Sequence, residues 1–371
     1  MVYNHPLNKD KKYVDWRLPE NRMEGFQRWL KWRMDYQDLD HYGVNNTYRD
    51  YAKMTKEQRY WYSLIFGMTY QSEMAWVIYS QFPNFEDIDL DKLKKWNIDN
   101  LDRQRYTTDT RYNKGRITEQ VASMKKEIAK SGNIVNYFES KLTDNEHESF
   151  ENIYNQNLNL HKFGRMTSWI TCQVLFETAN LPIRPNTMLA WEPSTKSPRS
   201  GLFFLYDRGE LREEKLTPDI IDWVKEKEVE LYEISKNYIG EKHKDIFSNY
   251  LLESHLCQYK KLLIGGDYPG HSSGDHVTRA NYLSNLWPEV DFTPFYKYAV
   301  MNQHPDIRGE TENKALRELC LKTGQFINMH NDYDDLPDMY LELGIKYNDP
   351  QEIVSKKIDY YMNNDNSYFQ I

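Results

Sequence analysis

TKEQRYWYSLIFGMTYQSEMAWVIYSQFP, residues 55–83, is the stretch of this sequence that decides the fold class. It opens with a capping-box pattern, in which the Thr55 hydroxyl caps a helix start and Gln58 reaches back to it. The apolar residues that follow recur at helical spacing. They are Trp61, Leu64, Ile65 and Met68, followed by Met74, Trp76, Val77 and Ile78. The pattern predicts one helix that continues to Phe82, where Pro83 ends it.

The same periodicity predicts helices along most of the chain. Beyond one after Pro19 and one ending near Trp96, they are expected at about residues 117–129, 134–142, 146–160, 166–179, 217–240, 246–263, 278–286, 310–322 and 350–362. The longest irregular stretch, residues 181–216, contains an apolar run at 202–206 that is expected to form one short strand at most.

These patterns predict a mainly α protein with one large, irregular multi-helix domain over residues 1–371 and at most a minor strand element. A soft internal boundary is expected within 181–216, and a frayed tail at 363–371.

The composition is acidic, with 48 Lys and Arg against 56 Asp and Glu and a formal net charge of −8. An acidic protein is not a general polyanion binder, so any nucleic-acid contact has to come from a local basic face. The three cysteines form no CxxC pair, which argues against a zinc ribbon and suits a reducing cytoplasm. No stretch approaches ~18 uninterrupted apolar residues, so no membrane span is expected.

Residues 103–116 form the clearest basic segment, with five basic side chains against one acidic side chain, Asp109. Arginine gives bidentate contacts to phosphate, and a loop that precedes a helix start offers backbone amides to an anion. The alternative is a solvated loop whose arginines pair with acidic neighbours.

Two further segments combine cations with small residues. Gly164 permits a turn before a helix whose first turn carries Arg165, a suitable place for an anion. Residues 194–201 combine hydroxyls with Lys196 and Arg199 but lack the Walker spacing. An ordinary capped turn and a surface loop are the alternatives. The three basic segments are expected to converge on one cleft, because an acidic protein that handles DNA has to concentrate its cations.

The helix expected at 246–263 carries Glu253 beside an apolar face, with Cys257, Lys260 and Lys261 on the adjoining stripe. The apolar face consists of Leu252, Leu256, Tyr259 and Leu263. A carboxylate or ammonium beside an apolar wall acquires a shifted pKa, as general acid–base catalysis requires. The alternative is a salt bridge at the rim, with Cys257 as small core filler.

Residues 267–276 hold two histidines and two aspartates but no HExxH pattern, and a metal site is not predicted there. The sequence lacks GxGxxG after a strand, a kinase signature and GxSxG. It also lacks Glu-x-x-His, which argues against a ferritin-like di-iron bundle.

Several strings, in this order, resemble the bacteriophage amino acid:DNA transferases, a helical family implicated in thymine hypermodification. They are FGMTY at 66–70 with MAWVI at 74–78, YTTDTRYNKG at 106–115, KFGR at 162–165, KSPRSGL at 196–202, and LE, LC and YKK between 252 and 261. The resemblance covers about residues 20–285. The sequence departs from the family pattern at Pro198, where histidine is expected, and at Ser200, where asparagine is expected.

The resemblance implies a reaction and its partners. Hydroxymethyluracil in phage DNA is first pyrophosphorylated by a kinase. The transferase then displaces pyrophosphate with the amine of an amino acid, which becomes bonded to the thymine methyl carbon. The implied partners are DNA carrying the modified thymine, a free amino acid and other phage DNA-modification enzymes in the host cytoplasm. No membrane, cofactor or metal is implied.

This chemistry needs cations for the leaving pyrophosphate, a base for the amine and a pocket for a flipped nucleotide. Residue chemistry makes Glu253 or Asp109 the candidate base. The candidates for phosphate and DNA contacts are Arg111, Lys114, Arg116, Lys162, Arg165, Lys196, Arg199, Lys260 and Lys261. The candidates for stacking on the base are Tyr70, Trp76 and Tyr112.

Two other functions remain open. One is a helical, base-flipping enzyme of the DNA glycosylase type with no amino-acid substrate, although the usual Leu-Pro-Gly-Ile/Val-Gly string is missing. The other is a non-catalytic helical scaffold in a phage DNA-modification complex, which would lack a deep pocket where the basic loops converge.

Overall fold

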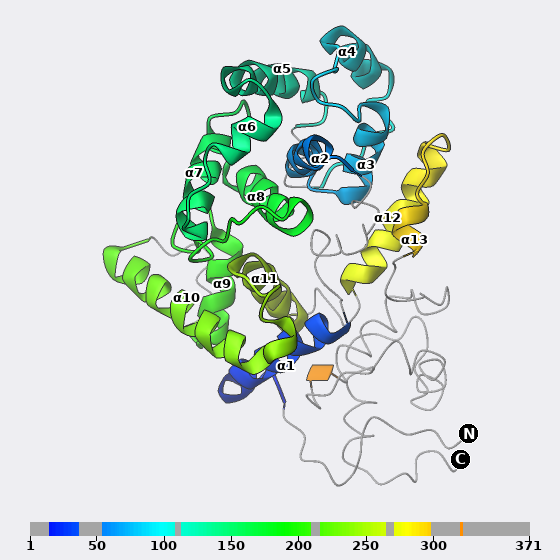
Figure 1. Cartoon of the computed structure of the whole chain (residues 1–371). Helices are drawn as coiled ribbons and strands as arrows, with labels where there is room; N and C mark the ends of the chain where they lie inside the picture. Colours follow the sequence, from blue (N-terminus) through cyan, green and yellow to red (C-terminus); the bar gives the residue numbers. More distant parts are fainter. Residues whose placement is uncertain are drawn as a thin grey trace, which may run out of the picture.

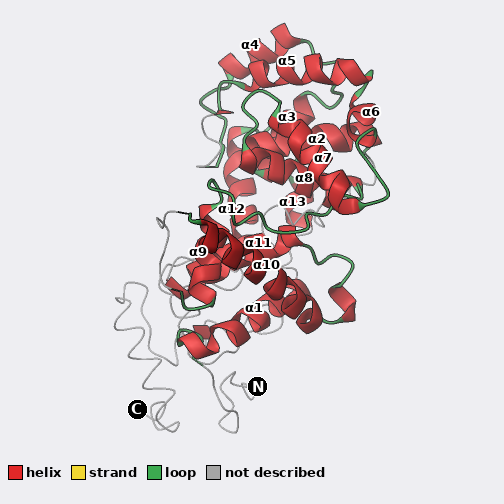
Figure 2. Ribbon diagram, turned by 90° about the vertical axis from the view of Figure 1, so that its left-hand side faces the viewer, coloured by secondary structure: helices red, strands yellow, loops and turns green. Residues whose placement is uncertain are grey.

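The computed structural model describes residues 15–36, 54–107, 113–208, 216–264, 271–297 and 320–321. Within these ranges the chain forms thirteen α-helices and short 3-10 turns, without a strand (Figures 1 and 2). The predicted mainly α class is therefore confirmed. No helix in the described part of the chain is both long and apolar enough to span a membrane.

One group of helices surrounds the packed pair α2 (Lys56–Thr69) and α8 (Arg165–Ala179) (Figure 1). The group also contains α3 (Ser72–Gln81), α4 (Leu90–Asp99), α5 (Ile117–Ile128), α6 (Ile134–Glu139) and α7 (Glu146–Leu158). Two more helices, α12 (His271–Leu286) and α13 (Thr293–Lys297), lie beside α3. A Cβ on Gly67 would lie 2.0 Å from Thr171 Oγ1, so only glycine lets α2 approach α8 this closely.

A second group consists of α1 (Arg22–Tyr36), α9 (Lys196–Leu205), α10 (Pro218–Ile239) and α11 (Asn249–Ile264). Each group has its own buried apolar cluster. Ile183 belongs to the first cluster and Met188 to the second, so the chain passes between them inside 181–216. Helix α11 connects the two, because Tyr250 packs in the first cluster and Leu252 in the second. The single-domain assignment and its soft boundary stay predictions.

The capping box at Thr55 is present, but the long helix expected after it is interrupted. Thr55 Oγ1 accepts the Gln58 N–H at 3.2 Å, and Gln58 Oε1 accepts the Thr55 N–H at 3.0 Å. Tyr70 then adopts the left-handed region (φ 49°) and caps α2, and α3 begins at Ser72. The prediction of one continuous helix to Phe82 was wrong, because apolar periodicity does not reveal a one-residue change in backbone conformation.

The irregular stretch 181–216 contains a helix, α9, where at most one short strand was expected near 203–206. The physical reason is tertiary: α9 packs along α11, and a Cβ on Gly201 would lie 2.8 Å from Leu256 Cγ. Helix α12 also begins at His271, earlier than the predicted start at 278. Apart from Cys320 and Leu321, the helices expected at 310–322 and 350–362 and the tail at 363–371 lie outside the described residues.

Candidate active site

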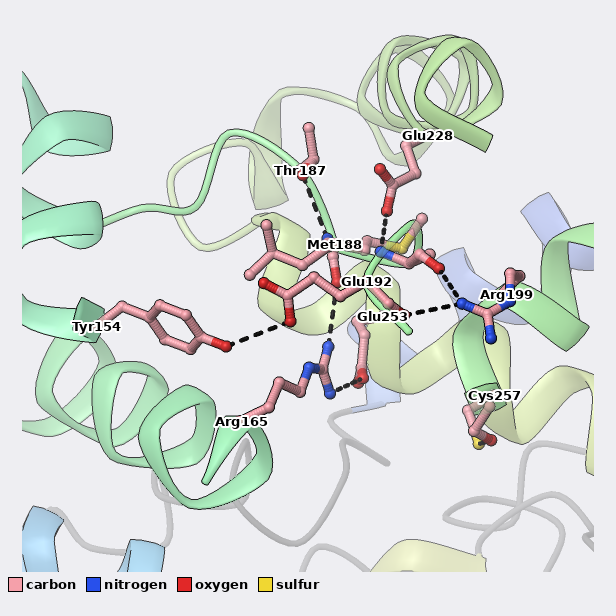
Figure 3. A network of polar contacts seen from close by, with 12 residues as sticks. Tyr154, Arg165, Thr187, Met188, Glu192, Arg199, Glu228, Glu253 and Cys257 are labelled. Carbon is pink, nitrogen blue, oxygen red and sulfur yellow. Dashed lines mark hydrogen bonds and ion pairs between the residues drawn. The ribbon is translucent and has the colours of Figure 1, made fainter. Parts of the chain in front are cut away.

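Arg165 stands in the first turn of α8, and its guanidinium makes two contacts that reach other parts of the fold (Figure 3). Its guanidinium donates to Glu253 Oε1 of α11 at 3.2 Å and to the Met188 carbonyl at 3.1 Å. It also lies 5.0 Å from the centroid of the Trp169 ring, one helical turn further along α8. The side chains of Arg165 and Glu253 are only 9% and 8% exposed, so this is a buried ion pair.

The Met188 carbonyl belongs to an irregular segment, residues 187–195, which we call the strap. Charged side chains from three helices bond to its backbone (Figure 3). Besides Arg165 of α8, Glu228 of α10 accepts the Ala190 N–H at 2.6 Å. Arg199 of α9 donates to the carbonyl oxygens of Ala190 and Glu192, at 2.9 Å each. Buried backbone groups need partners, and here charged side chains supply what a helix or sheet would supply elsewhere.

Two further carboxylates lie close to Arg165. Glu228 is 1% exposed, and burial raises the pKa of its carboxyl to about 7. Its Oε2 has no hydrogen-bond partner among the described residues. Burial also raises the pKa of the half-buried Glu192 carboxyl, whose Oε2 lies 3.5 Å from the Tyr154 hydroxyl. Together with Glu253, these residues place three carboxylates around one arginine.

Two more candidate cations are buried on α9 and α11, two helices that pack against each other. Arg199 is 4% exposed and Lys260 is 3% exposed, although cations are almost never buried without partners. Lys260 Nζ lies 3.4 Å from Ser200 Oγ, and Ser197 Oγ lies 2.7 Å from Cys257 Sγ. Burial raises the pKa of the Cys257 thiol, which disfavours a reactive thiolate.

The other candidate cations lie nearer to solvent. Lys162, Lys196, Lys261 and Arg116 are exposed, and Lys114 is half-buried. The structure therefore separates the predicted cations into a buried set (Arg165, Arg199 and Lys260) and an accessible set.

The described part of the basic segment 103–116 contacts α12 and α2, and none of the contacts given below is with the strap. Arg103 and Arg105 contact α12 or the residues just after it: Arg103 stacks on Trp287 at 3.8 Å, and Arg105 bonds to the Tyr282 hydroxyl at 2.9 Å. The two flanks of residues 108–112 are bonded to the end of α2. The Thr107 N–H donates to the Thr69 carbonyl at 3.4 Å, and Asn113 Nδ2 donates to the Met68 carbonyl at 2.8 Å. Candidates Asp109, Arg111 and Tyr112 lie outside the described residues. Thus the segments carrying Arg165 and Arg199 meet at the strap, whereas Arg103 and Arg105 are directed to α12.

Comparison with known proteins gives this arrangement a family. The profile of the amino acid:DNA transferase family matches residues 35–268. The chain belongs to this family. A relative described as a serinyltransferase, from Salmonella phage ViI, is 24% identical over 303 residues, which cover 74% of this chain and 72% of the relative. No solved structure matches the chain.

In this amino acid:DNA transferase, the stacking candidates differ in what they already contact. Tyr70 is half-buried at the C-cap of α2. Trp76 donates its indole N–H to the Asp291 carbonyl at 2.8 Å and packs edge-on against Phe295, so it holds the segment leading into α13. Among the described residues no group of three or more metal-ligating side chains occurs, and His276 is bonded to the buried Glu73 at 2.5 Å.

Sequence reasoning missed Glu192 and Glu228, and only Glu228 leaves a signal in the sequence. It occupies the buried stripe of α10, where every other large side chain is apolar. The stripe consists of Ile220, Val224, Glu228, Leu231, Ser235 and Ile239. A lone carboxylate on such a stripe predicts a buried, functional or paired group. Glu192 sits in the strap, where no periodicity exists to mark it.

Proposed function

We propose that this transferase joins the amine of a free amino acid to pyrophosphorylated hydroxymethyluracil in DNA, with pyrophosphate as the leaving group. Family membership supports the transfer of an amino acid to DNA in general terms. The serinyltransferase relative makes serine the first amino acid to test.

The observation that carries the proposal is the buried cluster of Arg165, Arg199 and Lys260 in a chain of net charge −8. Burying a charge costs free energy, and charged groups that are nevertheless held inside a fold are candidates for a functional site. A leaving pyrophosphate gains negative charge in the transition state. Fixed guanidinium and ammonium groups in a water-poor site stabilise that charge more than solvent does.

The first turn of α8 supplies a specific place for the leaving group. Its N-cap is Gly164, which provides no side-chain cap. Arg165 Nε and the hydroxyls of Thr167 and Ser168 are buried and have no hydrogen-bond partner among the described residues. Together with the positive end of the helix dipole, these donors suit a pyrophosphate.

The accessible cations suit the DNA backbone. Lys162 and Lys196 are exposed and form no ion pair with another described residue. Mobile lysines of this kind bind phosphates as point charges without reading sequence. We propose that they hold the strand while the modified base is flipped toward the strap, with Tyr70 as the described candidate for stacking.

The test is to incubate the protein with DNA that contains pyrophosphorylated hydroxymethyluracil and with serine, then with each other amino acid singly. Digested nucleosides are analysed by mass spectrometry, and released pyrophosphate is measured in parallel. We expect one amino-acid-substituted thymidine per pyrophosphate released. DNA containing unmodified hydroxymethyluracil is the matched control and should give neither product.

The alternatives give different products in the same assay. Abasic sites would indicate a base-removing enzyme of the glycosylase type. Unchanged DNA with every amino acid would contradict the proposal and favour a scaffold. In the cell, this reaction would depend on a kinase that makes the pyrophosphorylated base, and such a kinase would be a functional partner of this protein.

A further inference from the structure

Arg165, Glu228 and Arg199, the three charged side chains that bond to the strap, are called the braces. They hold the backbone around one ionisable residue, Glu192. The bonds from Arg165, Glu228 and Arg199 all reach the backbone of residues 188–192. Two backbone bonds tighten the same turn: Glu192 N–H to the Leu189 carbonyl at 3.1 Å, and Thr195 N–H to the Glu192 carbonyl at 2.9 Å. Residues 188–192 read Met-Leu-Ala-Trp-Glu, so Glu192 carries the only ionisable side chain among them.

The strap also stores backbone strain. Leu189 has φ 54°, in the left-handed region that residues with a bulky side chain rarely adopt. Such a conformation persists only where its surroundings over-determine it, and strained residues cluster at functional sites. Here the surroundings are the three charged braces and the Thr187 hydroxyl, which accepts the Leu189 N–H at 3.2 Å.

The side chain of Glu192 has the environment that a proton acceptor needs. It is half-buried, so part of it is exposed to solvent, and it forms no ion pair with a described cation. Figure 3 shows its carboxylate between the Tyr154 hydroxyl and the Arg165 guanidinium. The charged and titratable groups that face it or hold its backbone are Tyr154 of α7, Arg165 of α8, Arg199 of α9, Glu228 of α10 and Glu253 of α11. Burial raises the pKa of this carboxyl, in the direction that improves a base at neutral pH.

Glu253, the base expected from the sequence, has a different set of contacts. Its carboxylate accepts the Arg165 guanidinium in a buried ion pair at 3.2 Å. The oxygen that accepts this bond is already occupied by the guanidinium. Glu253 is therefore better placed to position Arg165 than to accept a proton.

We propose that Glu192 is the catalytic proton acceptor that generates the free amine of the amino acid, and that Glu228 and Arg199 are positioning residues acting through the strap. The assignment rests on the proposed function. The ammonium transfers one proton to the Glu192 carboxylate, which leaves a lone pair on nitrogen. That lone pair forms the N–C bond to the methylene carbon of the base. The C–O bond to pyrophosphate breaks, and pyrophosphate departs with the bonding electrons.

The test compares Glu192→Gln, Glu253→Gln and wild-type protein in the nucleoside assay between pH 6 and pH 9.5. Glu226→Gln is the matched control, because Glu226 lies on α10 with its side chain 69% exposed. We expect Glu192→Gln to lower kcat/KM at pH 7 by about 10²–10⁴-fold, the range typical of a lost general base. The loss should shrink toward pH 9.5, where the free amine is abundant. Glu226→Gln should match the wild type, and the loss in Glu253→Gln should not depend on pH.

The outcomes separate the two levels of the proposal. No product from wild-type protein overturns the proposed function and this assignment with it. Wild-type activity together with a Glu192→Gln rate within threefold at pH 7, or with an equal loss at pH 7 and pH 9.5, overturns the assignment alone. Rescue at high pH in Glu253→Gln instead makes Glu253 the base. If Glu192→Gln does not fold by circular dichroism, Glu192→Asp decides. A reduced rate with the wild-type pH profile supports the assignment, and an unchanged rate at every pH overturns it.

Discussion

Arg103 and Arg165 make the same three kinds of contact in two regions of the molecule. Arg103 pairs with Glu289 at 2.7 Å, donates to the Leu286 carbonyl at 2.7 Å and stacks on Trp287 at 3.8 Å. Arg165 pairs with a glutamate at 3.2 Å, donates to a carbonyl at 3.1 Å and stacks on a tryptophan at 5.0 Å. The contact types alone do not distinguish the two arginines.

Burial and neighbours do distinguish them. The side chains of the Arg103–Glu289 pair are 34% and 47% exposed, whereas those of the Arg165–Glu253 pair are 9% and 8% exposed. Arg165 also has Glu192 and Glu228 close by, and it reaches the strained strap. Arg103 joins the loop that follows α4 to the end of α12. The comparison teaches that burial and neighbouring carboxylates, and not the contact types, separate a structural arginine from a candidate site residue.

The largest effect is expected from removing each arginine in turn. Arg165→Ala removes one partner of a buried ion pair, which typically costs about 3–5 kcal/mol. Arg103→Ala breaks a solvated pair, a hydrogen bond to the Leu286 carbonyl and one ring contact, which together contribute about 1–3 kcal/mol. Urea unfolding followed by circular dichroism measures both. Similar losses for the two variants would contradict the distinction between a buried and a solvated pair.

A double variant distinguishes the effect of the Arg165–Glu253 pair on stability from its effect on amino-acid transfer. Arg165→Met with Glu253→Met replaces both charges by apolar groups of similar length, which is often neutral or stabilising. We expect this protein to recover most of the stability lost in Arg165→Ala while transfer stays undetectable. Recovery of transfer would show that the leaving group is held elsewhere.

The next effect concerns Glu228 and its dependence on pH. Its folded-state pKa is raised from 4.5 to about 7, so the folded protein binds a proton more tightly than the unfolded chain. The stability from this group is fully present below pH 4.5 and is lost as pH rises through about 7. Glu228→Gln removes this loss. Each tenfold difference in proton affinity between the folded and unfolded chain corresponds to about 1.4 kcal/mol. Relative to wild type, the free energy of unfolding of Glu228→Gln should therefore improve by about 2–3 kcal/mol between pH 5 and pH 8.

Glu226→Gln is the control for this titration. Glu226 lies on the same helix, but its side chain is 69% exposed, so its substitution should produce no comparable change between the two pH values. An equal response in both variants would show that the pH dependence does not come from the strap.

How much of this site the sequence predicts depends on whether a residue lies on a regular helix. Arg165 and Glu253 were identified because their helices are periodic, and the structure joins the two side chains. Glu192 was missed because the strap is held by contacts from α8, α9 and α10, which no local pattern encodes. The break at Tyr70 and the helix at 196–205 were missed for a related reason. A left-handed cap and packing against α11 both override the local apolar pattern.

The smallest effect should come from the accessible cations, and it sharpens the contrast with the buried ones. Lys162→Ala and Lys196→Ala remove exposed charges with no described ion pair, so the free energy of unfolding should change by less than about 0.5 kcal/mol. If each lysine contacts a phosphate, each variant should lower the slope of log affinity for DNA against log salt by about 0.7–0.9. Lys95→Ala is the matched control, because Lys95 is 78% exposed on α4 and pairs with Asp99. Fluorescence anisotropy with labelled DNA at several salt concentrations measures the slopes. A slope in Lys162→Ala or Lys196→Ala equal to that of Lys95→Ala would place the DNA backbone on another face and leave only the buried cluster to recognise phosphate.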